Sequence, residues 1–179
     1  MKTFEELKED LLERAKKHHA CQDGYSMGLN AKSKQDLLKA ITNNWYWVLS
    51  TSKMIDANYL EENFTEEELT EAGIYTRKEH TSNAKSFACG SATVEAYGSA
   101  TVEAYDSATV EAYDSAKVEA YDSAKVEAYG SAKVEAYDNS YVEDCTGNIN
   151  TVSDHGIVKD YHNHKIYIKK GKFKIIEIE

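Results

Sequence analysis

The sequence predicts an α+β protein, with a small N-terminal helical domain followed by a thin parallel β-solenoid of octapeptide repeats and a C-terminal β cap. Apolar residues three and four apart run through the first part of the chain, and six consecutive octads occupy residues 90–137. A short segment of alternating apolar residues ends the chain. We therefore divide the chain into a helical domain or cap at 1–80, an octad solenoid at 81–153 and a β cap at 154–179.

The first predicted helix carries an apolar stripe at the spacing of an amphipathic helix. Its members are Phe4, Leu7, Leu11, Leu12 and Ala15. The segment Cys21–Asn30, "CQDGYSMGLN", is predicted to be a loop because it contains two glycines.

A second helix is predicted to start at Ser33, with Asp36 near the capping-box position. Its predicted buried stripe consists of Leu37, Leu38, Ile41, Trp45 and Val48. A third, short helix should start at the capping box of Thr65 and Glu68 and end at Gly73. Four aromatic residues are expected to build the core of this domain: Trp45, Tyr46, Trp47 and Phe64.

Each octad reads Gly or Asp, Ser, Ala, Thr or Lys, Val, Glu, Ala, Tyr. A period of eight residues fits neither of the repeats, seven and eleven, that keep a stripe on one helix face. Val and Thr favour strands, and the Gly/Asp-Ser boundary favours a turn. In the fourth octad Ala116, Val118 and Ala120 would share one strand face, and Ser, Lys, Glu and Tyr would share the other. The octads therefore predict short strands that stack into a solenoid.

The Ala-Val-Ala face must point inward, because the charged residues cannot line a narrow interior. Small inward residues require two closely spaced walls, which favours two octads per coil. Residues sixteen apart would then stack at about 4.8 Å. A triangular coil of three octads is the less favoured alternative because its wider interior would need bulkier residues. The handedness of the coil stays open.

This arrangement predicts regular outward columns. One wall would carry Glu95, Glu111, Glu127 and Glu143, and the opposite wall would carry Glu103, Glu119 and Glu135. Two tyrosine ladders would follow: Tyr97, Tyr113, Tyr129, and Tyr105, Tyr121, Tyr137. From Lys117 onward a lysine stands two residues before each glutamate, whereas the earlier octads have threonine there. We expect the early carboxylates to be uncompensated.

Both ends of the stack need protection against edge-to-edge pairing. The helical domain is expected to lean on the solenoid and close one end. At the other end, Ile166–Glu179, "IYIKKGKFKIIEIE", is predicted to form a hairpin or final coil around its Lys-Gly turn.

The chain carries a net charge of −10, divided into −4 for residues 1–80, −8 for 81–153 and +2 for 154–179. An acidic surface repels nucleic acid and anionic membranes but suits a protein partner with a basic groove. We expect no signal peptide, because no N-terminal run combines basic residues with an apolar core, and no apolar stretch approaches membrane-spanning length. Three widely separated cysteines favour a reducing compartment, so we expect the bacterial cytoplasm.

No enzymatic chemistry or cofactor is predicted. Asp160, His162 and His164 alternate, so on one strand they would share a face and offer a weak metal-site hypothesis. Histidines on a solvated surface explain the same pattern more simply. Each octad contains a serine, but no general base stands beside it. The octad glycines are typical of turns and form no phosphate-binding loop.

The octads, such as "GSATVEAYDSATVEAY", resemble those of a group of uncharacterised proteins from phages and prophages of gut bacteria. The resemblance extends to "LLERAKKHHACQDGYSMGLNAKSKQDLLKAI", "NNWYWV" and "EAGIYT" in the N-terminal part, and so covers most of the chain. It implies a helical head, a β-solenoid and a phage-linked origin. It brings no activity and no catalytic residues.

The expected function is a non-enzymatic acidic interaction protein, a phage-borne inhibitor of a host defence system that mimics nucleic acid, as an inhibitor of a CRISPR nuclease would. The expected partner is a protein with a basic nucleic-acid-binding surface, with no direct nucleic-acid or membrane binding. Its binding residues would be Glu95, Glu103, Glu111, Glu119, Glu127, Tyr97, Tyr105 and Tyr113. The alternative is a structural or dimerisation rod whose helical head or Lys-rich C-terminal end carries the binding. Flat Tyr and Thr ladders would suit a homodimer.

Overall fold

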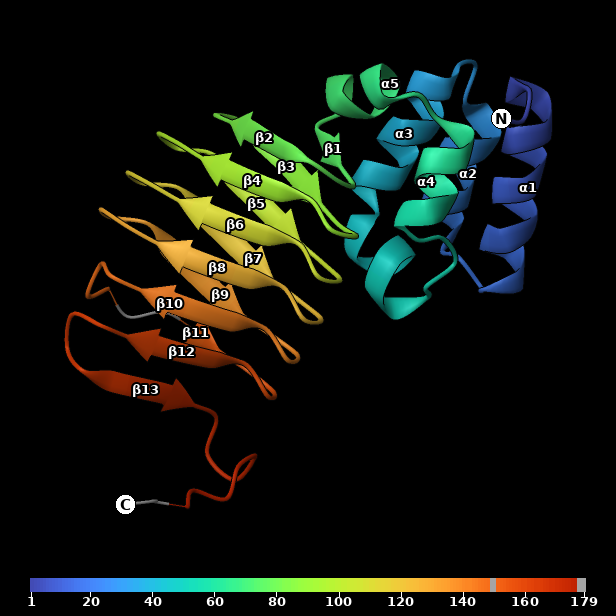
Figure 1. Ribbon diagram of the computed structural model, residues 1–179. Coiled ribbons are helices and arrows are strands. Elements are labelled where there is room, and N and C mark those ends of the chain that lie inside the picture. The colour runs from blue at the N-terminus through green and yellow to red at the C-terminus, as the bar shows by residue number, and fades with distance from the viewer. Residues whose placement is uncertain (149–150, 177–179) are drawn as a thin grey trace. The chain divides into compact units, whose positions relative to one another are not determined.

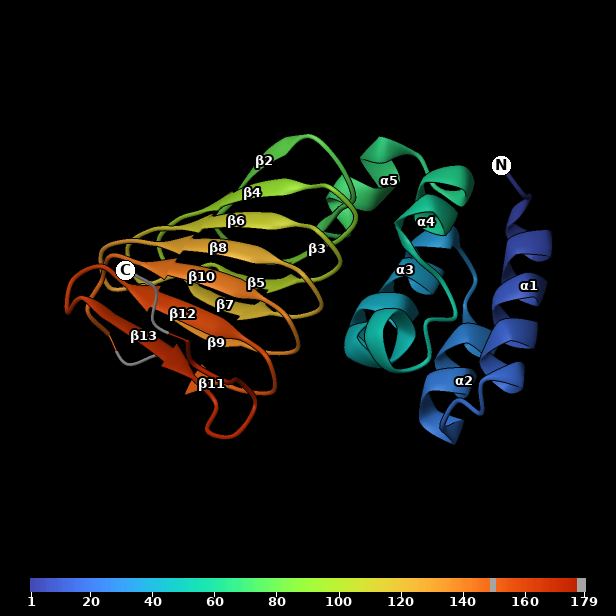
Figure 2. The ribbon, with the colours of Figure 1, turned by 60° about the horizontal axis from the view of Figure 1, so that its bottom comes forward.

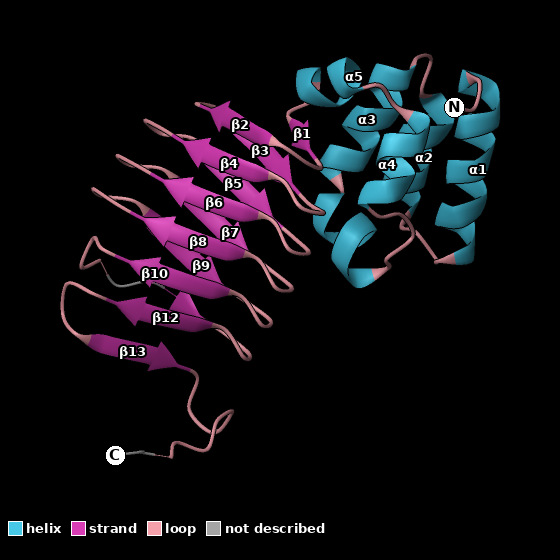
Figure 3. Cartoon of the chain, viewed as in Figure 1, coloured by secondary structure: helices cyan, strands magenta, loops and turns pink. Residues whose placement is uncertain are grey.

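A computed structural model describes residues 1–148 and 151–176. The chain divides into two compact units, Met1–Thr76 and Arg77–Glu179. Figure 3 shows that helices make up most of the first unit and strands most of the second. The predicted fold class, helices followed by a parallel β-solenoid, is confirmed.

The first unit contains several short helices, most of which start at a polar N-cap. Their bounds are α1 Phe4–Lys17, α2 Gln22–Asn30, α3 Lys34–Asn43, the π-helical segment η1 Trp47–Thr51, α4 Ala57–Asn63 and α5 Glu66–Glu71, followed by the short strand β1 Ile74–Tyr75. The predicted start of α3 at Ser33 is confirmed, since its side chain accepts from the Asp36 N–H. The capping box of Thr65 and Glu68 is also confirmed.

The prediction of a loop at Cys21–Asn30 is wrong, because residues 22–30 form α2. Neither Gly24 nor Gly28 has a positive φ, so they are not turn residues. A Cβ on Gly24 would stand 3.1 Å from Asn44 Oδ1, and one on Gly28 would stand 3.3 Å from Leu12 Cδ2. These glycines therefore serve close helix packing.

The core of the first unit matches the apolar stripes in part. Trp45 and Phe64 are buried as predicted. Tyr46 is 51% exposed and Trp47 is half-buried, so the expectation that they belong to the core is wrong for Tyr46 and only partly right for Trp47. Leu37, Leu38 and Ile41 are the buried residues of α3; Trp45 and Val48 are also buried but lie beyond its end.

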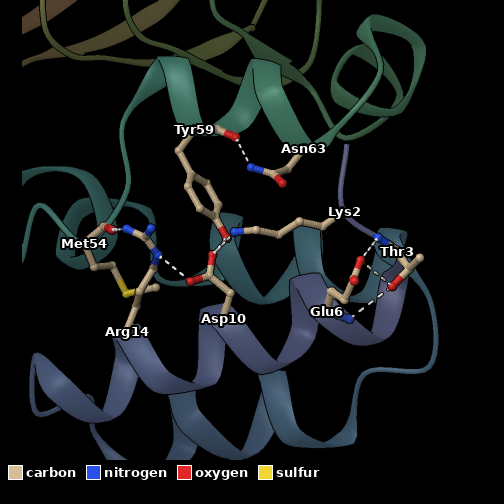
Figure 4. A network of polar contacts seen from close by, with 8 residues as sticks. All are labelled: Lys2, Thr3, Glu6, Asp10, Arg14, Met54, Tyr59 and Asn63. Atoms are coloured by element: carbon tan, nitrogen blue, oxygen red, sulfur yellow. Dashed lines mark hydrogen bonds and ion pairs between the residues drawn. The ribbon is translucent and has the colours of Figure 1, made fainter.

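A polar network around Asp10 joins α1 to α4 and to the segment before it (Figure 4). Asp10 accepts hydrogen bonds from Lys2, from the Tyr59 hydroxyl at 2.7 Å and from Arg14 Nε at 3.2 Å. Arg14 also donates to the Met54 carbonyl at 3.0 Å. Partial burial raises the pKa of Asp10, but the three hydrogen bonds outweigh it and hold the pKa below its usual value.

The second unit is a β-solenoid of about five turns. Its strands are β2 Glu79–Ser82, β3 Lys85–Ala88, β4 Thr93–Ala96, β5 Thr101–Ala104, β6 Thr109–Ala112, β7 Lys117–Ala120, β8 Lys125–Ala128, β9 Lys133–Ala136, β10 Tyr141–Asp144, β11 Thr151–Val152, β12 Ile157–Asp160 and β13 Lys165–Ile168. One wall runs β3-β5-β7-β9-β11 and the other runs β2-β4-β6-β8-β10-β12-β13. Figures 1 and 2 show that successive strands alternate between these two walls, so that each coil contributes one strand to each wall.

The predicted register of sixteen residues, with two octads per coil, is confirmed. Strands β4 and β6 pair in parallel, with Glu95 opposite Glu111, and β6 and β8 continue with Glu111 opposite Glu127. On the other wall Glu103 pairs with Glu119, and Glu119 with Glu135. The outward carboxylates therefore form the expected columns.

The interior is thin and closed. The Ala-Val-Ala residues of every octad are at most 1% exposed. Val94, for example, pairs in register with Val110, and Ala96 with Ala112. Because no inward side chain is larger than valine in the six octads, the walls can lie close together.

Each corner requires a residue with a positive φ at the first octad position. Gly98 has φ 62° and Gly130 has φ 63°, while Asp106 and Asp114 have 56° and 53°. Glycine adopts this region freely and aspartate tolerates it. Aspartate adds a contact, because Asp114 Oδ2 accepts from the Gly98 N–H of the previous coil at 3.0 Å. The positive φ and this contact together explain why the first octad position is always either Gly or Asp.

The C-terminal hairpin lies earlier than predicted. It is formed by β12 and β13, which pair antiparallel, and the chain reverses at 161–164. Asp160 closes this turn by accepting from Asn163 N and Nδ2, both at 2.8 Å. Residues 169–176 form no strand, so the predicted hairpin around the Lys-Gly turn is wrong over the described residues. Residues 177–179 of that prediction lie outside the described part of the chain.

The thin interior makes a specific prediction about Ala112, which is fully buried between the register partners Ala96 and Ala128. Ala112→Leu should lower the free energy of unfolding by about 1–3 kcal/mol through overpacking, measured by urea denaturation. Thr109→Leu adds a leucine to the outer face of the same strand and should leave stability within about 0.5 kcal/mol. Equal stability of the two variants would show that the interior has spare room.

Candidate interaction surface on the solenoid walls

Phenol–carboxylate pairs repeat along both walls. Because Glu and Tyr stand two residues apart on the outer face, each tyrosine hydroxyl can reach the glutamate of its own octad. Tyr97 donates to Glu95 at 3.1 Å and Tyr113 to Glu111 at 2.6 Å. The same contact recurs in later octads: Tyr121 to Glu119 at 2.8 Å, Tyr129 to Glu127 at 2.7 Å, and Tyr137 to Glu135.

The tyrosine rings stack in the two predicted ladders. Ring centroids are 4.9 Å apart for Tyr97–Tyr113 and 5.2 Å for Tyr113–Tyr129. In the other ladder they are 4.8 Å apart for both Tyr105–Tyr121 and Tyr121–Tyr137. Since neighbouring rings cover one another's faces, the ladder offers a partner ring edges and carboxylate oxygens rather than stacking faces.

The carboxylates raise the pKa of the phenols beside them. Hydrogen bonding to Glu127 is the main reason that the pKa of Tyr129 rises to about 12. Hydrogen bonding to Glu95 and Glu111 likewise raises the pKa values of Tyr97 and Tyr113. For Tyr121 burial is the larger cause, followed by its bond to Glu119. The phenols therefore stay protonated donors at neutral pH.

The eight predicted binding residues fall on opposite walls. The wall of β4, β6 and β8 carries Glu95, Glu111, Glu127, Tyr97 and Tyr113. The wall of β5 and β7 carries Glu103, Glu119 and Tyr105. A single flat partner surface cannot contact both groups, so the predicted set divides into two candidate surfaces.

The wall of β5 and β7 differs from the expectation in two places. Lys85 Nζ lies 3.1 Å from Glu103 Oε1, so the early carboxylates are not all uncompensated. Lys85 pairs in register with Thr101, which makes Glu103 its diagonal neighbour across the strands. Tyr105 is fully buried, so the prediction that it is displayed to solvent is wrong. The wall of β4, β6 and β8 is therefore the better candidate.

The arrangement expected for a metal site at Asp160, His162 and His164 is wrong. Asp160 ends β12, whereas the two histidines lie in the turn that follows, so the three do not share a strand face. Asp160 is 2% exposed, and the bonds from Asn163 are the main cause of its lowered pKa. Among residues 1–148 and 151–176 we find no cluster of three or more His, Cys, Asp or Glu side chains arranged for a metal ion.

Sequence reasoning missed the phenol–carboxylate bonds and the bonds between corner aspartates and the preceding coil. The signal for the first was available, because Glu-x-Tyr spacing places both side chains on one strand face. The second depends on the sixteen-residue register together with the positive φ of the corner.

In the described part of the chain no helix is both long and apolar enough to cross a membrane.

Comparison with protein-family models, curated proteins and solved structures finds no match to this chain.

The Tyr129–Glu127 pair predicts a measurable titration. Glu127→Gln should lower the pKa of Tyr129 from about 12 towards the ordinary value of 10, because the neutral amide no longer disfavours the phenolate. Site-resolved NMR between pH 8 and 13 would follow it. Since the phenol pKa is higher in the folded state, this pair stabilises the fold below pH 10 and loses that contribution as pH rises through about 12.

Glu119→Gln provides the control for this titration, since Glu119 bonds Tyr121 on the opposite wall and should leave the pKa of Tyr129 unchanged. An unchanged pKa in Glu127→Gln would contradict the assigned hydrogen bond.

Proposed function

We propose that the protein is a non-enzymatic interaction protein whose solenoid presents carboxylates to a basic, nucleic-acid-binding surface of a protein partner. The observation that supports this most is the in-register column of Glu95, Glu111 and Glu127, each accepting a bond from a tyrosine of its own octad. A carboxylate has about four lone-pair sites. One phenol contact therefore leaves capacity for a partner's arginine or lysine.

The linear charge density supports a nucleic-acid mimic. Residues 90–113 carry four acidic side chains and no basic one. These residues make one and a half coils, or about 7 Å of solenoid axis at a strand spacing of about 4.8 Å. Counted over both walls, this gives about one negative charge per 1.8 Å, against about 1.7 Å for double-stranded DNA counted over both strands. Lys85 offsets one of these charges, at Glu103, which leaves the wall of β4 and β6 as the strongest part.

Rigidity favours this use of the wall. Glu95 and Glu111 stand on strands whose neighbours are fixed by inter-coil hydrogen bonds, such as Tyr113 N to Ala96 O at 2.8 Å. Their phenol contacts fix the side chains as well. A preorganised array loses little conformational entropy when it binds, so more of the electrostatic attraction is retained. For a phage-borne chain, a host-defence nuclease such as that of a CRISPR system is a partner of this kind.

A second candidate is a structural rod that binds through its C-terminal end. Ile166 is 66% exposed, and Ile175 and Ile176 are 75% and 71% exposed. Five lysines accompany these residues between Lys165 and Lys174. An exposed apolar group with basic neighbours is typical of an association surface, which here includes a homodimer.

The experiment starts with a partner captured from a bacterial host lysate and measures its dissociation constant by calorimetry. Glu95→Gln/Glu111→Gln should weaken binding at least tenfold, about 1.4 kcal/mol, because it removes two charges while keeping hydrogen-bond acceptors. The dependence of the affinity on salt should also become shallower.

The matched control is Glu119→Gln/Glu135→Gln, which removes two charges from the opposite wall. It should change affinity by less than about twofold, which is under 0.5 kcal/mol. Full affinity in Glu95→Gln/Glu111→Gln, with loss of binding when Ile175 and Ile176 become serine, would favour the rod instead. Tyr46 is exposed, and loss of partner binding in a Tyr46→Ser variant would assign binding to the helical unit.

A further inference from the structure

The helical unit contains a half-enclosed cavity of about 350 Å³ between α1, α2, α3 and η1. Its wall is mainly apolar, with Leu11, Leu12, Leu37, Ile41 and Val48 among the lining residues. Cavities that bind small molecules start at about 300 Å³ and are mostly apolar with a few placed polar groups. The volume is many times that of one water molecule, about 30 Å³ in the liquid.

The α2 side of the cavity is formed by two glycines and one larger residue, Tyr25. No residue of this nine-residue helix is fully buried. Gly24 and Gly28 line the cavity from α2, and Ala15 and Ala40 line it from α1 and α3. Glycine weakens a helix relative to alanine, but here it allows close packing, because a Cβ would stand 3.1 Å from Asn44 Oδ1 at position 24 and 3.3 Å from Leu12 Cδ2 at position 28. Gly24 and Gly28 therefore bring the α2 backbone to the wall of the cavity.

A separate feature supplies the aromatic side of the cavity. Trp47 and Val48 line it from η1, a π-helical segment of five residues. π-Helical turns are rare in proteins and are frequent at functional sites. Met54 also lines the cavity, and its carbonyl is fixed by the hydrogen bond from Arg14 at 3.0 Å.

The lining chemistry selects the class of ligand. The residues around the cavity include His19 but no Asp, Glu, Lys or Arg, so a cationic ligand would lose its hydration without a carboxylate to pair with. Asn44 is held by donation from its Nδ2 to the Ala40 carbonyl at 2.8 Å. Its Oδ1 faces the Gly24 side of the cavity, 3.1 Å from where a Cβ on that glycine would stand. Asn44 therefore offers a fixed acceptor beside an apolar space.

We infer that this cavity binds an uncharged, planar aromatic molecule that carries one hydrogen-bond donor. The ring lies in the cavity beside Trp47, and the donor bonds to Asn44 Oδ1. This site is independent of the solenoid walls and of their proposed partner.

Indole is the test probe, because it has one ring N–H and no charge. Titration of the full chain, followed by methyl NMR, should give saturable shifts confined to Leu12, Leu37 and Val48, with a dissociation constant below 1 mM, the upper end of weak specific binding. Benzothiophene lacks the donor and should bind at least fivefold more weakly. Benzylamine, which is cationic at neutral pH, should give no saturable shift.

Gly28→Leu fills the cavity and should abolish the indole shifts. Asn30→Leu is the control: it adds the same side chain at an exposed position of α2 and should leave the indole shifts in place. Gly28→Ala serves as a milder variant if leucine disturbs folding, and it should weaken binding measurably while circular dichroism stays unchanged. Absence of saturable indole shifts in the wild type would overturn the inference. Unchanged indole affinity in a folded Gly28→Leu protein would overturn it as well.

Discussion

The solenoid depends on one constraint: a sixteen-residue coil in which backbone groups bond to the next coil around an interior that admits only small side chains. Successive coils are tied at strands and corners alike, as in the bonds from Thr109 N to Ala92 O at 2.9 Å and from Ser107 N to Gly90 O at 3.1 Å. Because strand side chains alternate, closing the Ala-Val-Ala face inward forces Thr or Lys, Glu and Tyr outward. A slip by one residue would bury the glutamates, so the register that satisfies the backbone also determines the surface.

The same constraint stacks like charges, which is unfavourable. The chain reduces this cost in three ways. The phenols donate to the carboxylates at contacts such as Tyr113–Glu111, which gives these charges a protonated partner. The corner aspartates direct one oxygen to backbone N–H groups, as Asp114 does to Gly98. The later octads add a lysine on the same face, and Lys85 does so for Glu103. Among the contacts described, Glu95 and Glu111 have only the hydrogen bond from a phenol and no lysine partner. The least compensated charge therefore lies on their wall.

The octads carried most of the information on the solenoid, since period, inward face and octads per coil follow from side-chain size and strand geometry. The sequence could not show the ion pair of Lys85, because it depends on a diagonal contact between coils at the irregular start of the stack. The loop predicted at α2 failed because glycine signals a turn by default, whereas Gly24 and Gly28 meet packing neighbours. The hairpin was misplaced because Asp160 and Asn163 close an earlier turn than the Lys-Gly pair. The cavity arises from residues of four separate helical segments, which no local pattern brings together.

The register itself is open to direct measurement through the tyrosine rings. In a sample with selectively labelled tyrosines, nuclear Overhauser contacts should join Tyr97 to Tyr113 and Tyr113 to Tyr129, whose centroids are 4.9 and 5.2 Å apart. Tyr105, Tyr121 and Tyr137 should form a second, separate set. Contacts between tyrosines sixteen residues apart, and none between those eight or twenty-four apart, are the predicted result. Contacts between Tyr97 and Tyr105, or between Tyr97 and Tyr121, would contradict the two-octad coil and with it the carboxylate columns.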